Sequence, residues 1–179
     1  METKTGLVIM HRNCDLRKDK TSFGIIDAQS VQNADTAGSK GYDAGKKVSG
    51  IKRHIIVDTQ GLPHALLVTT ANVTDRNGAI EMIGINLENL SEVKKFLVDG
   101  GYSGQPFAKA VAQLCGAEVE VVKRDELHKF VVLPMRWVVE RTFGWLDKSR
   151  RLWKNCEYSP HTSLQMMVLA LIAVLVKRF

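Results

Sequence analysis

Apolar residues follow two different periods along this chain, and each period predicts a different kind of element. Short runs rich in β-branched residues and bounded by Gly, Pro or Asp predict strands, whereas apolar residues three and four positions apart predict helices. The predicted strands are Phe23–Ile26, Arg53–Asp58, His64–Thr69, Lys95–Val98 and Glu118–Val122. The predicted helices are Asp75–Leu90, Pro106–Leu114, about Pro134–Leu152 and roughly Thr162–Arg178.

The order of these elements predicts the fold class. Residues 31–52 are rich in Gly and small polar side chains and predict a long exposed loop, while Thr59–Pro63 has the glycine and proline of a hairpin. The order corresponds to an α/β fold of ribonuclease H-like arrangement, with a mixed five-stranded sheet flanked by helices. Residues 1–22 show no period and are predicted to be a linker or the truncated edge of a missing N-terminal region, so the predicted domain spans residues 23–179.

Composition narrows the class of protein. With 45% hydrophobic and 25% charged residues, the 179-residue chain has the make-up of one soluble globular domain. Its formal net charge of +6 favours a polyanionic partner. Cys14, Cys115 and Cys156 are too far apart in sequence to indicate a zinc site or a disulfide framework, which is typical of a reducing cytosol. The apolar run Met166–Val176 is shorter than the ~18 residues of a membrane-spanning helix, so we expect a cytoplasmic protein without a membrane partner.

Three acidic residues carry the chemistry that the pattern favours. Asp27 follows the first predicted strand, Asp99 follows the fourth and precedes the glycine-rich stretch 100–104, and Glu140 lies in the third predicted helix. Carboxylates delivered from separate rigid elements can converge on hard divalent cations such as Mg²⁺. Two such ions activate the attacking oxygen and stabilise the leaving oxygen of a phosphodiester displacement. We therefore expect these three residues to be both metal ligands and catalytic residues of a site that cuts or joins nucleic acid.

Each of these carboxylates also has an ordinary structural interpretation. An aspartate at the end of a strand is typical of a turn, and Asp99 in particular is typical of a side-chain cap where a strand leads into a helix. Glu140 lies four residues after Arg136, which is the spacing of a surface ion pair on a helix. Alternatively, Arg136 holds a phosphate while Glu140 holds a metal ion.

Other polar residues near the ends of predicted elements are expected to be structural. Asp58 is predicted to belong to the hairpin, and Asp75 or its neighbour Thr74 is predicted to cap the helix that begins there. The histidines have no metal-site spacing, so none is predicted to be a ligand; they include His54, His64, His128 and His161.

Basic side chains gather in two regions of the chain. Charge runs are usually solvated surfaces, but beside metal-binding carboxylates they favour contact with DNA phosphates. The candidates for DNA binding are Lys46, Lys47, Lys52 and Arg53 in the first region, and Arg136, Arg141, Lys148, Arg150 and Arg151 in the second, which also holds Trp145 and Trp153.

Several longer stretches of the sequence match a known pattern. They are IIDAQSV, GYDAGKKVSGIKRHIIVDTQGLP, TDRNGA, VDGGYSG, VKR and FVVLPMRWVVERTFGWLDKSRRLWKNCEY, all within residues 23–179. Through them the chain resembles insertion-sequence transposases of the DDE superfamily, specifically the IS-five-like group. The resemblance implies a ribonuclease H-like fold in which Asp27, Asp99 and Glu140 form the DDE triad and bind two Mg²⁺ ions, for which Mn²⁺ can substitute. In that group an activated water cuts the transposon end, and the released 3′-hydroxyl attacks target DNA.

The resemblance also implies partners. Double-stranded DNA is expected both as the inverted-repeat ends of a transposon and as the target, with a homo-oligomer assembled on the DNA at the nucleoid. Only 26 residues precede Asp27, so we expect the end-recognition region either to come from an upstream reading frame or to be lost. The alternative function is a non-catalytic fragment that binds DNA or inhibits a full-length enzyme.

Two positions depart from the group's tyrosine-arginine-glutamate-lysine signature. Leu133 stands at the tyrosine position, and Asp147 stands at the lysine position with Lys148 one residue further on, whereas Arg136 matches the arginine. The basic helper role that the signature lysine would have is therefore assigned to Lys148 as a hypothesis.

Overall fold

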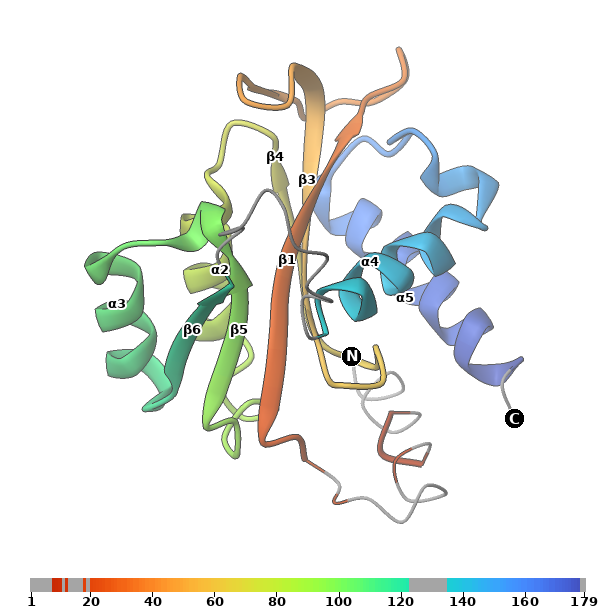
Figure 1. Ribbon diagram of the computed structural model, residues 1–179. Helices are drawn as coiled ribbons and strands as arrows, with labels where there is room; N and C mark the ends of the chain where they lie inside the picture. Colours follow the sequence, from red (N-terminus) through yellow and green to blue (C-terminus); the bar gives the residue numbers. More distant parts are fainter. Residues whose placement is uncertain (1–7, 11, 13–17, 19, 123–134, 178–179) are drawn as a thin grey trace, which may run out of the picture.

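A six-stranded mixed sheet forms the centre of the molecule (Figure 1). The computed structural model describes residues 8–10, 12, 18, 20–122 and 135–177. Strands pair in the order β2-β3-β1-β5-β6, and β4 also pairs with β3. Among the pairs of strands in the described residues, β1–β5 and β5–β6 are parallel and the others are antiparallel. The strands are β1 Phe23–Gln32, β2 Gly41–Asp43, β3 Val48–Val57, β4 Pro63–Thr70, β5 Lys95–Asp99 and β6 Glu118–Val122.

Helices cover both faces of this sheet, with α2 and α3 on one side and α4 and α5 on the other (Figure 1). Because side chains alternate along a strand, β1, β3, β4, β5 and β6 contribute to both layers. Ile25 of β1 and Leu97 of β5 pack in the layer of α4 and α5, whereas Ile26 and Phe96 pack in the layer of α2 and α3. The helices are α2 Asp75–Gly84, α3 Gln105–Cys115, α4 Arg136–Asp147 and α5 Pro160–Val176, with short 3₁₀ turns η1 Gly100–Tyr102 and η2 Arg150–Leu152.

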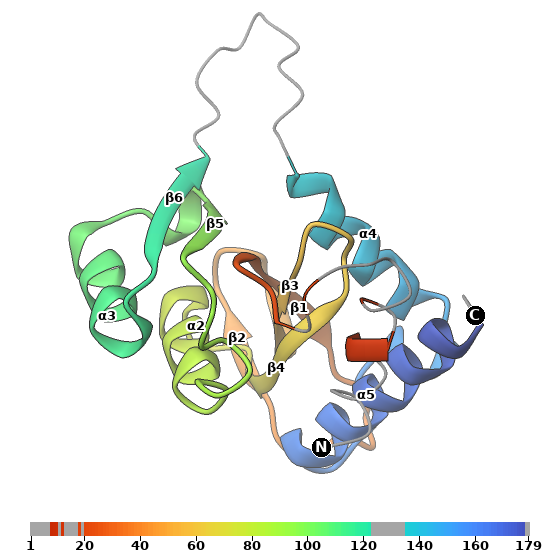
Figure 2. The ribbon, with the colours of Figure 1, turned by 90° about the horizontal axis from the view of Figure 1, so that it is seen from below.

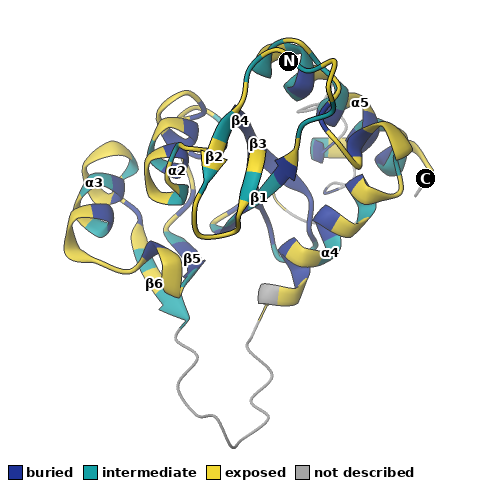
Figure 3. Ribbon diagram, turned by 90° about the horizontal axis from the view of Figure 1, so that it is seen from above, coloured by how far each residue is buried: buried dark blue, intermediate teal, exposed yellow. Residues whose placement is uncertain are grey.

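The buried residues of the helices face this sheet, and their exposed residues lie on the outer side (Figure 3). On α4, Val138, Val139 and Leu146 are each at most 1% exposed and belong to the same core cluster as Ile25. Burial of a side chain of this kind stabilises the fold by about 1.5–3 kcal/mol. Packing therefore fixes α4 against the face of the sheet on which Ile25 lies.

Local signals set where several of these elements begin and end. The Thr74 side chain accepts a hydrogen bond from the N–H of Asn77 and caps α2. Gly116, at φ 69°, ends α3 in the left-handed conformation that favours glycine. Asp58 lies in the β3–β4 hairpin, where its carboxylate accepts the N–H groups of Gln60 and Leu62. The hairpin role of Asp58 and the Thr74 cap are therefore confirmed.

The prediction was wrong about the segment between the first two strands. β1 does not end at Asp27 but continues to Gln32, and residues 31–52 contain β2 and the start of β3 as well as a loop. The cause is pairing with a strand that is distant in sequence. Asp27 lies opposite Ile55 of β3, and the residues that follow it continue this pairing as far as Gln32 opposite Gly50. The short β2 makes the sheet six-stranded instead of five-stranded.

The helix that begins at Asp75 is shorter than predicted, because α2 ends at Gly84 instead of Leu90. The chain then continues as turns, and the side-chain amide of Asn86 donates to the carbonyl of Met82 at 2.8 Å. Leu90 is still buried, although it belongs to a turn and not to the helix. Pro134, the predicted start of the following helix, lies outside the described residues.

The described residues of the N-terminal segment pack against the domain. Val8 is 3% exposed and forms a small cluster with Leu62 of the hairpin and Leu175 of α5. Figure 2 shows the short red segment that begins at residue 8 beside α5. Arg12 is also 3% exposed, and its guanidinium forms an ion pair with Asp58 at 2.5 Å. Val8 and Arg12 thus contact residues of the β3–β4 hairpin and α5.

Within the described part of the chain, no helix is long and apolar enough to span a membrane. The apolar run in α5 instead covers the sheet, with Met167 and Leu171 buried in the same core cluster as Ile25.

Candidate active site

Asp27 and Asp99 lie where β1 and β5 stop pairing. The two strands are in parallel register from Phe23 with Lys95 to Ile25 with Leu97, and each aspartate follows two residues after the last pair. By strand alternation both aspartates lie on the face of Ile25 and Leu97, which is the face that α4 covers. The site thus forms where neighbouring strands of an α/β sheet separate, which is a common position for ligands.

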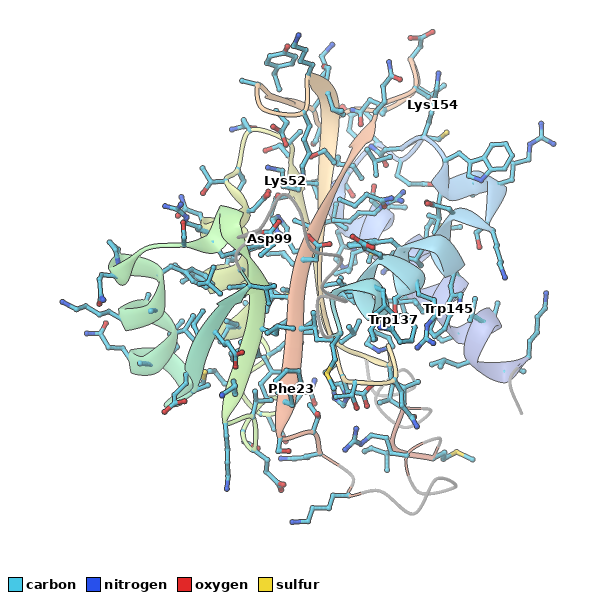
Figure 4. The ribbon with its side chains drawn as sticks, viewed as in Figure 1. Phe23, Lys52, Asp99, Trp137, Trp145 and Lys154 are labelled. Carbon is cyan, nitrogen blue, oxygen red and sulfur yellow. The ribbon has the colours of Figure 1, made fainter. Side chains whose placement is uncertain are left out.

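A small pocket occupies this gap. It has a volume of about 250 Å³, and both aspartates line it together with Lys46 of the β2–β3 turn, Val122 of β6 and Val139 of α4. Five separate segments of the chain therefore converge here, and rigid strands deliver both carboxylates. Figure 4 shows Asp99 beside β1, with Trp137 and Trp145 on the α4 side.

Each aspartate has one oxygen engaged by a neighbouring backbone N–H. Asp27 Oδ1 accepts from Ala28 at 2.8 Å, and Asp99 Oδ1 accepts from Gly101 at 2.9 Å and caps η1. The capping interpretation of Asp99 is therefore confirmed. It does not exclude a ligand role, because a carboxylate has two oxygens and about four lone-pair sites.

Tyr102 is a buried tyrosine in η1, close to the two aspartates in sequence or in charge interaction. Its side chain is 1% exposed and packs on Phe107, and its hydroxyl has no hydrogen-bond partner within the described residues. Burial, followed by the negative charges of Asp27, Asp75 and Asp99, raises the pKa of Tyr102 well above its ordinary value. The two carboxylates that line the pocket form an oxygen donor set that fits a hard divalent cation.

Glu140 lies on the neighbouring helix but is not part of the pocket lining. It is exposed and directly follows Val139, which does line the pocket. Among the described residues, no group of three or more His, Cys, Asp or Glu side chains is close enough to hold one metal ion. The structure thus brings two of the three predicted ligands together and places the third one residue beyond the pocket wall.

Lys46 connects the pocket to the β2–β3 turn. Its ammonium donates to the carbonyl of Ala28 at 3.0 Å and lies 3.7 Å from Asp75. Asp43 builds the turn by accepting the N–H groups of Gly45 and Lys46. Burial alone would raise the pKa of Asp43, but hydrogen bonds from Ser30, from the Lys46 N–H and from Lys52 lower it well below its usual range.

Two of the predicted DNA-binding residues have structural partners instead. Lys52 is 4% exposed and forms ion pairs with Asp43 at 3.1 Å and Asp75 at 2.8 Å. Arg53 is 2% exposed and donates to the carbonyl of Leu152, and burial lowers its pKa to about 10. Because both side chains are almost completely buried and already have partners within the fold, the structure does not favour the predicted phosphate contacts of Lys52 and Arg53. Asp75, predicted as a possible cap, holds Lys52 while Thr74 performs the capping.

Arg141 is also engaged within the fold. Its guanidinium lies between the rings of Trp137 and Trp145, 4.7 and 5.0 Å from their centroids, and donates to the carbonyl of Gln60 at 2.7 Å. This arrangement ties α4 to the β3–β4 hairpin.

The other predicted basic contacts lie at the end of α4 and in η2. Lys148, Arg150 and Arg151 are exposed there, and Arg151 pairs with Glu157 at 2.9 Å. None of these three lines the pocket of the two aspartates. The side chain of Arg136 lies outside the described part of the structure, as does Leu133.

Two residues near this site were not among those predicted from the sequence. Tyr102 is buried in η1, the turn that Asp99 caps, and Arg76 of α2 donates from Nε to the carbonyl of Gly101 at 2.9 Å. The only sequence signal was that both belong to stretches that carried the resemblance, TDRNGA and VDGGYSG.

Comparisons with known proteins show the family of this chain. Residues 18–175 match the family described as Transposase DDE domain. The chain is also 34% identical over 110 residues to a transposase for insertion sequence element IS402 of Burkholderia cepacia. That match covers 58% of this chain and 52% of the relative, so the chain matches about half the length of the curated relative.

Solved structures confirm the fold. A chain of the simian T-cell lymphotropic virus intasome, in complex with a PP2A regulatory subunit, superposes with a TM-score of 0.54 at 17% identity, covering 87% of this chain and 48% of that chain. The catalytic core domain of BIV integrase superposes with a TM-score of 0.51 at 10% identity, covering 85% and 82%. The predicted α/β fold of ribonuclease H-like arrangement is therefore confirmed, while the narrower IS-five-like grouping stays a prediction. Because the family match spans almost all of its residues, the chain belongs to the DDE transposase family.

Proposed function

We propose that this chain is the catalytic domain of a DNA transposase, in which Asp27, Asp99 and Glu140 hold divalent metal ions for phosphodiester cleavage and strand transfer. The observation that carries the proposal is the pair of aspartates at the separation of β1 and β5, in a chain of the DDE transposase family. Metal ions bound there, Mg²⁺ or Mn²⁺, would activate the attacking oxygen and stabilise the leaving oxygen.

The residues of this chain prepare the site in distinct ways. The backbone hydrogen bonds to Asp27 and Asp99 fix one oxygen of each carboxylate, which limits the rotamers that the side chains sample. Glu140 supplies the third carboxylate when α4 or its side chain shifts toward the pocket that Val139 already lines. The ammonium of Lys46 faces the same pocket and provides a contact for a phosphate oxygen.

The partner in this proposal is double-stranded DNA, as transposon ends and as target. Lys46 and Lys47 are exposed in the turn next to the pocket and contact phosphates near the reacting bond, whereas Lys148, Arg150 and Arg151 contact DNA further away. Assembly as a homo-oligomer on DNA, and end recognition by a segment supplied from elsewhere, complete the proposal.

The direct test is nicking of supercoiled plasmid in Mg²⁺ or Mn²⁺. Asp99→Asn preserves the shape of the side chain but removes its charge, and we expect it to reduce nicking by at least about 100-fold, the scale of losing a metal ligand or its close support. Asp35→Asn is the matched control, because Asp35 is exposed and lies outside the pocket. Equal nicking by the wild type and Asp99→Asn would refute the assignment.

One observation favours a second candidate function, binding of DNA without cleavage. Among the described residues the three carboxylates do not form a single group. A chain that binds duplex DNA but shows no metal-dependent nicking, with or without Asp99, would support this alternative.

A further inference from the structure

A second hollow adjoins the pocket of the two aspartates. It has a volume of about 850 Å³ and lies between the β2–β3 turn and the start of α2. Lys46 lines both hollows, and Gly101, whose N–H holds Asp99, also lines the second one. We call this hollow the α2 groove. Lys46 is thus common to the α2 groove and to the pocket that holds the metal in the proposed function.

The charges inside the α2 groove are almost balanced. Its two carboxylates, Asp43 and Asp75, both lie within 3.1 Å of the buried Lys52 ammonium, and Asp75 also lies 3.7 Å from Lys46. Two negative and two positive groups thus cancel among the charged lining residues, which leaves the positive charge of Arg76. The groove therefore favours an anion at the position of Arg76 and not along its whole length.

Arg76 is held in place and still presents donors to the groove. Its side chain is exposed, and its Nε donates to the carbonyl of Gly101 at 2.9 Å. The N–H of the same residue, Gly101, donates to Asp99 at 2.9 Å, so Arg76 and Asp99 are joined through one residue. Within the described residues Arg76 forms no ion pair, and the two terminal nitrogens of a guanidinium match the spacing of two phosphate oxygens.

We infer that the α2 groove binds the phosphodiester backbone of the DNA strand that enters the aspartate pocket, and that Arg76 is a phosphate ligand. The identity of the ligand rests on the proposed function. The exposed amide of Asn77, in the first turn of α2, lies in the same groove and donates to the same backbone. Arg76 thereby couples DNA contact to the backbone turn that holds Asp99.

The test is the salt dependence of binding to a fluorescein-labelled 20-base-pair duplex, measured by anisotropy in EDTA so that no cleavage occurs. Loss of one phosphate contact lowers the slope of log affinity against log salt by about 0.9. We expect Arg76→Ala to lower it by about that amount and Arg76→Lys to retain most of it, since Lys keeps the charge without the planar fork. Lys109→Ala is the matched control, because Lys109 is an exposed cation on α3 outside the groove. A slope for Arg76→Ala equal to that of the control would overturn the inference.

A second variant covers the case in which Arg76→Ala disturbs the turn after Asp99. Asn77→Asp adds a negative charge at an exposed position in the first turn of α2, where an acidic residue suits the helix dipole. Its thermal melt should match that of the wild type, while its affinity for the duplex should fall several-fold. Unchanged affinity would contradict the inference. If Arg76→Ala lowers the salt slope while Asp99→Asn leaves nicking unaffected, the α2 groove binds DNA but the proposed catalytic role of Asp99 is wrong. If Asp99→Asn abolishes nicking while Arg76→Ala leaves the salt slope unchanged, only the inference about the groove is wrong.

Discussion

Replacement of Asp58 should test how strongly the N-terminal segment is tied to the domain. Asp58 is completely buried, and Oδ1 accepts the N–H groups of Gln60 and Leu62 at 2.9 and 3.0 Å. Its Oδ2 lies 2.5 Å from the guanidinium of Arg12, which also donates to two carbonyls of its own segment. Asp58→Asn keeps an acceptor for the hairpin but leaves Arg12 buried without its counter-charge.

The magnitude follows from these contacts. Removal of one member of a buried, hydrogen-bonded ion pair costs about 3–5 kcal/mol, because the remaining charge stays away from water. The loss of unfolding free energy should be near the lower end of this range for Asp58→Asn. It should be near the upper end for Asp58→Ala, because alanine also leaves the N–H groups of Gln60 and Leu62 without their acceptor. Either loss is a large share of the 5–15 kcal/mol that typically stabilises a domain.

The assay is urea denaturation followed by circular dichroism, with the exposed Asp35→Asn as control. Burial acts to raise the pKa of Asp58, but the nearby His64 and the N–H groups of Leu62 and Gln60 act against it and lower the pKa from 3.8 to about 2. A lowered pKa contributes stability above the unfolded value that is lost as the pH falls toward the folded value. The advantage of the wild type over Asp58→Asn should therefore shrink by about 2 kcal/mol between pH 5 and pH 2. A difference below 1 kcal/mol at pH 7, or one independent of pH, would refute the reasoning.

Further substitutions test the packing around the site. A Cβ at Gly78 would lie 2.1 Å from the buried ring of His54, so Gly78→Ala should lower stability by about 1–3 kcal/mol in a denaturation series, whereas Gly84→Ala, where a Cβ meets nothing within 4 Å, should not. Lys52→Met leaves two carboxylates without their shared cation and should cost about 2 kcal/mol, a value reduced because Asp75 is partly exposed. Equal melting temperatures for Lys52→Met and the wild type would contradict the structural role assigned to Lys52.

Local patterns predicted those elements whose limits are set by nearby residues. β6 matches its predicted limits and β5 extends only one residue further, because both are short, valine-containing segments beside a helix signal. α3 ends where Gly116 adopts a positive φ, as its sequence position suggested. These boundaries depend on capping and turn chemistry within a few residues of sequence.

Elements that depend on distant partners could not be predicted in this way. The polar Gln29 and Ser30 lie in β1 only because they pair with Arg53 and Lys52 of β3. The same pairing buries those two cations, which in the sequence looked like a basic surface. Likewise, Asp27 was predicted as a strand end but lies within β1, and its place in the pocket results from where β5 diverges.

The central claim is that Asp27 and Asp99, completed by Glu140, hold divalent metal for phosphodiester chemistry. The most direct measurement is the anomalous difference map of a crystal grown with Mn²⁺ and a DNA duplex, in which the metal is located without reference to activity. The account predicts manganese peaks in contact with Asp27 and Asp99, with the Glu140 carboxylate as a further ligand. Manganese bound at Asp43 and Asp75 only, or no peak between Asp27 and Asp99 with DNA present, would contradict it.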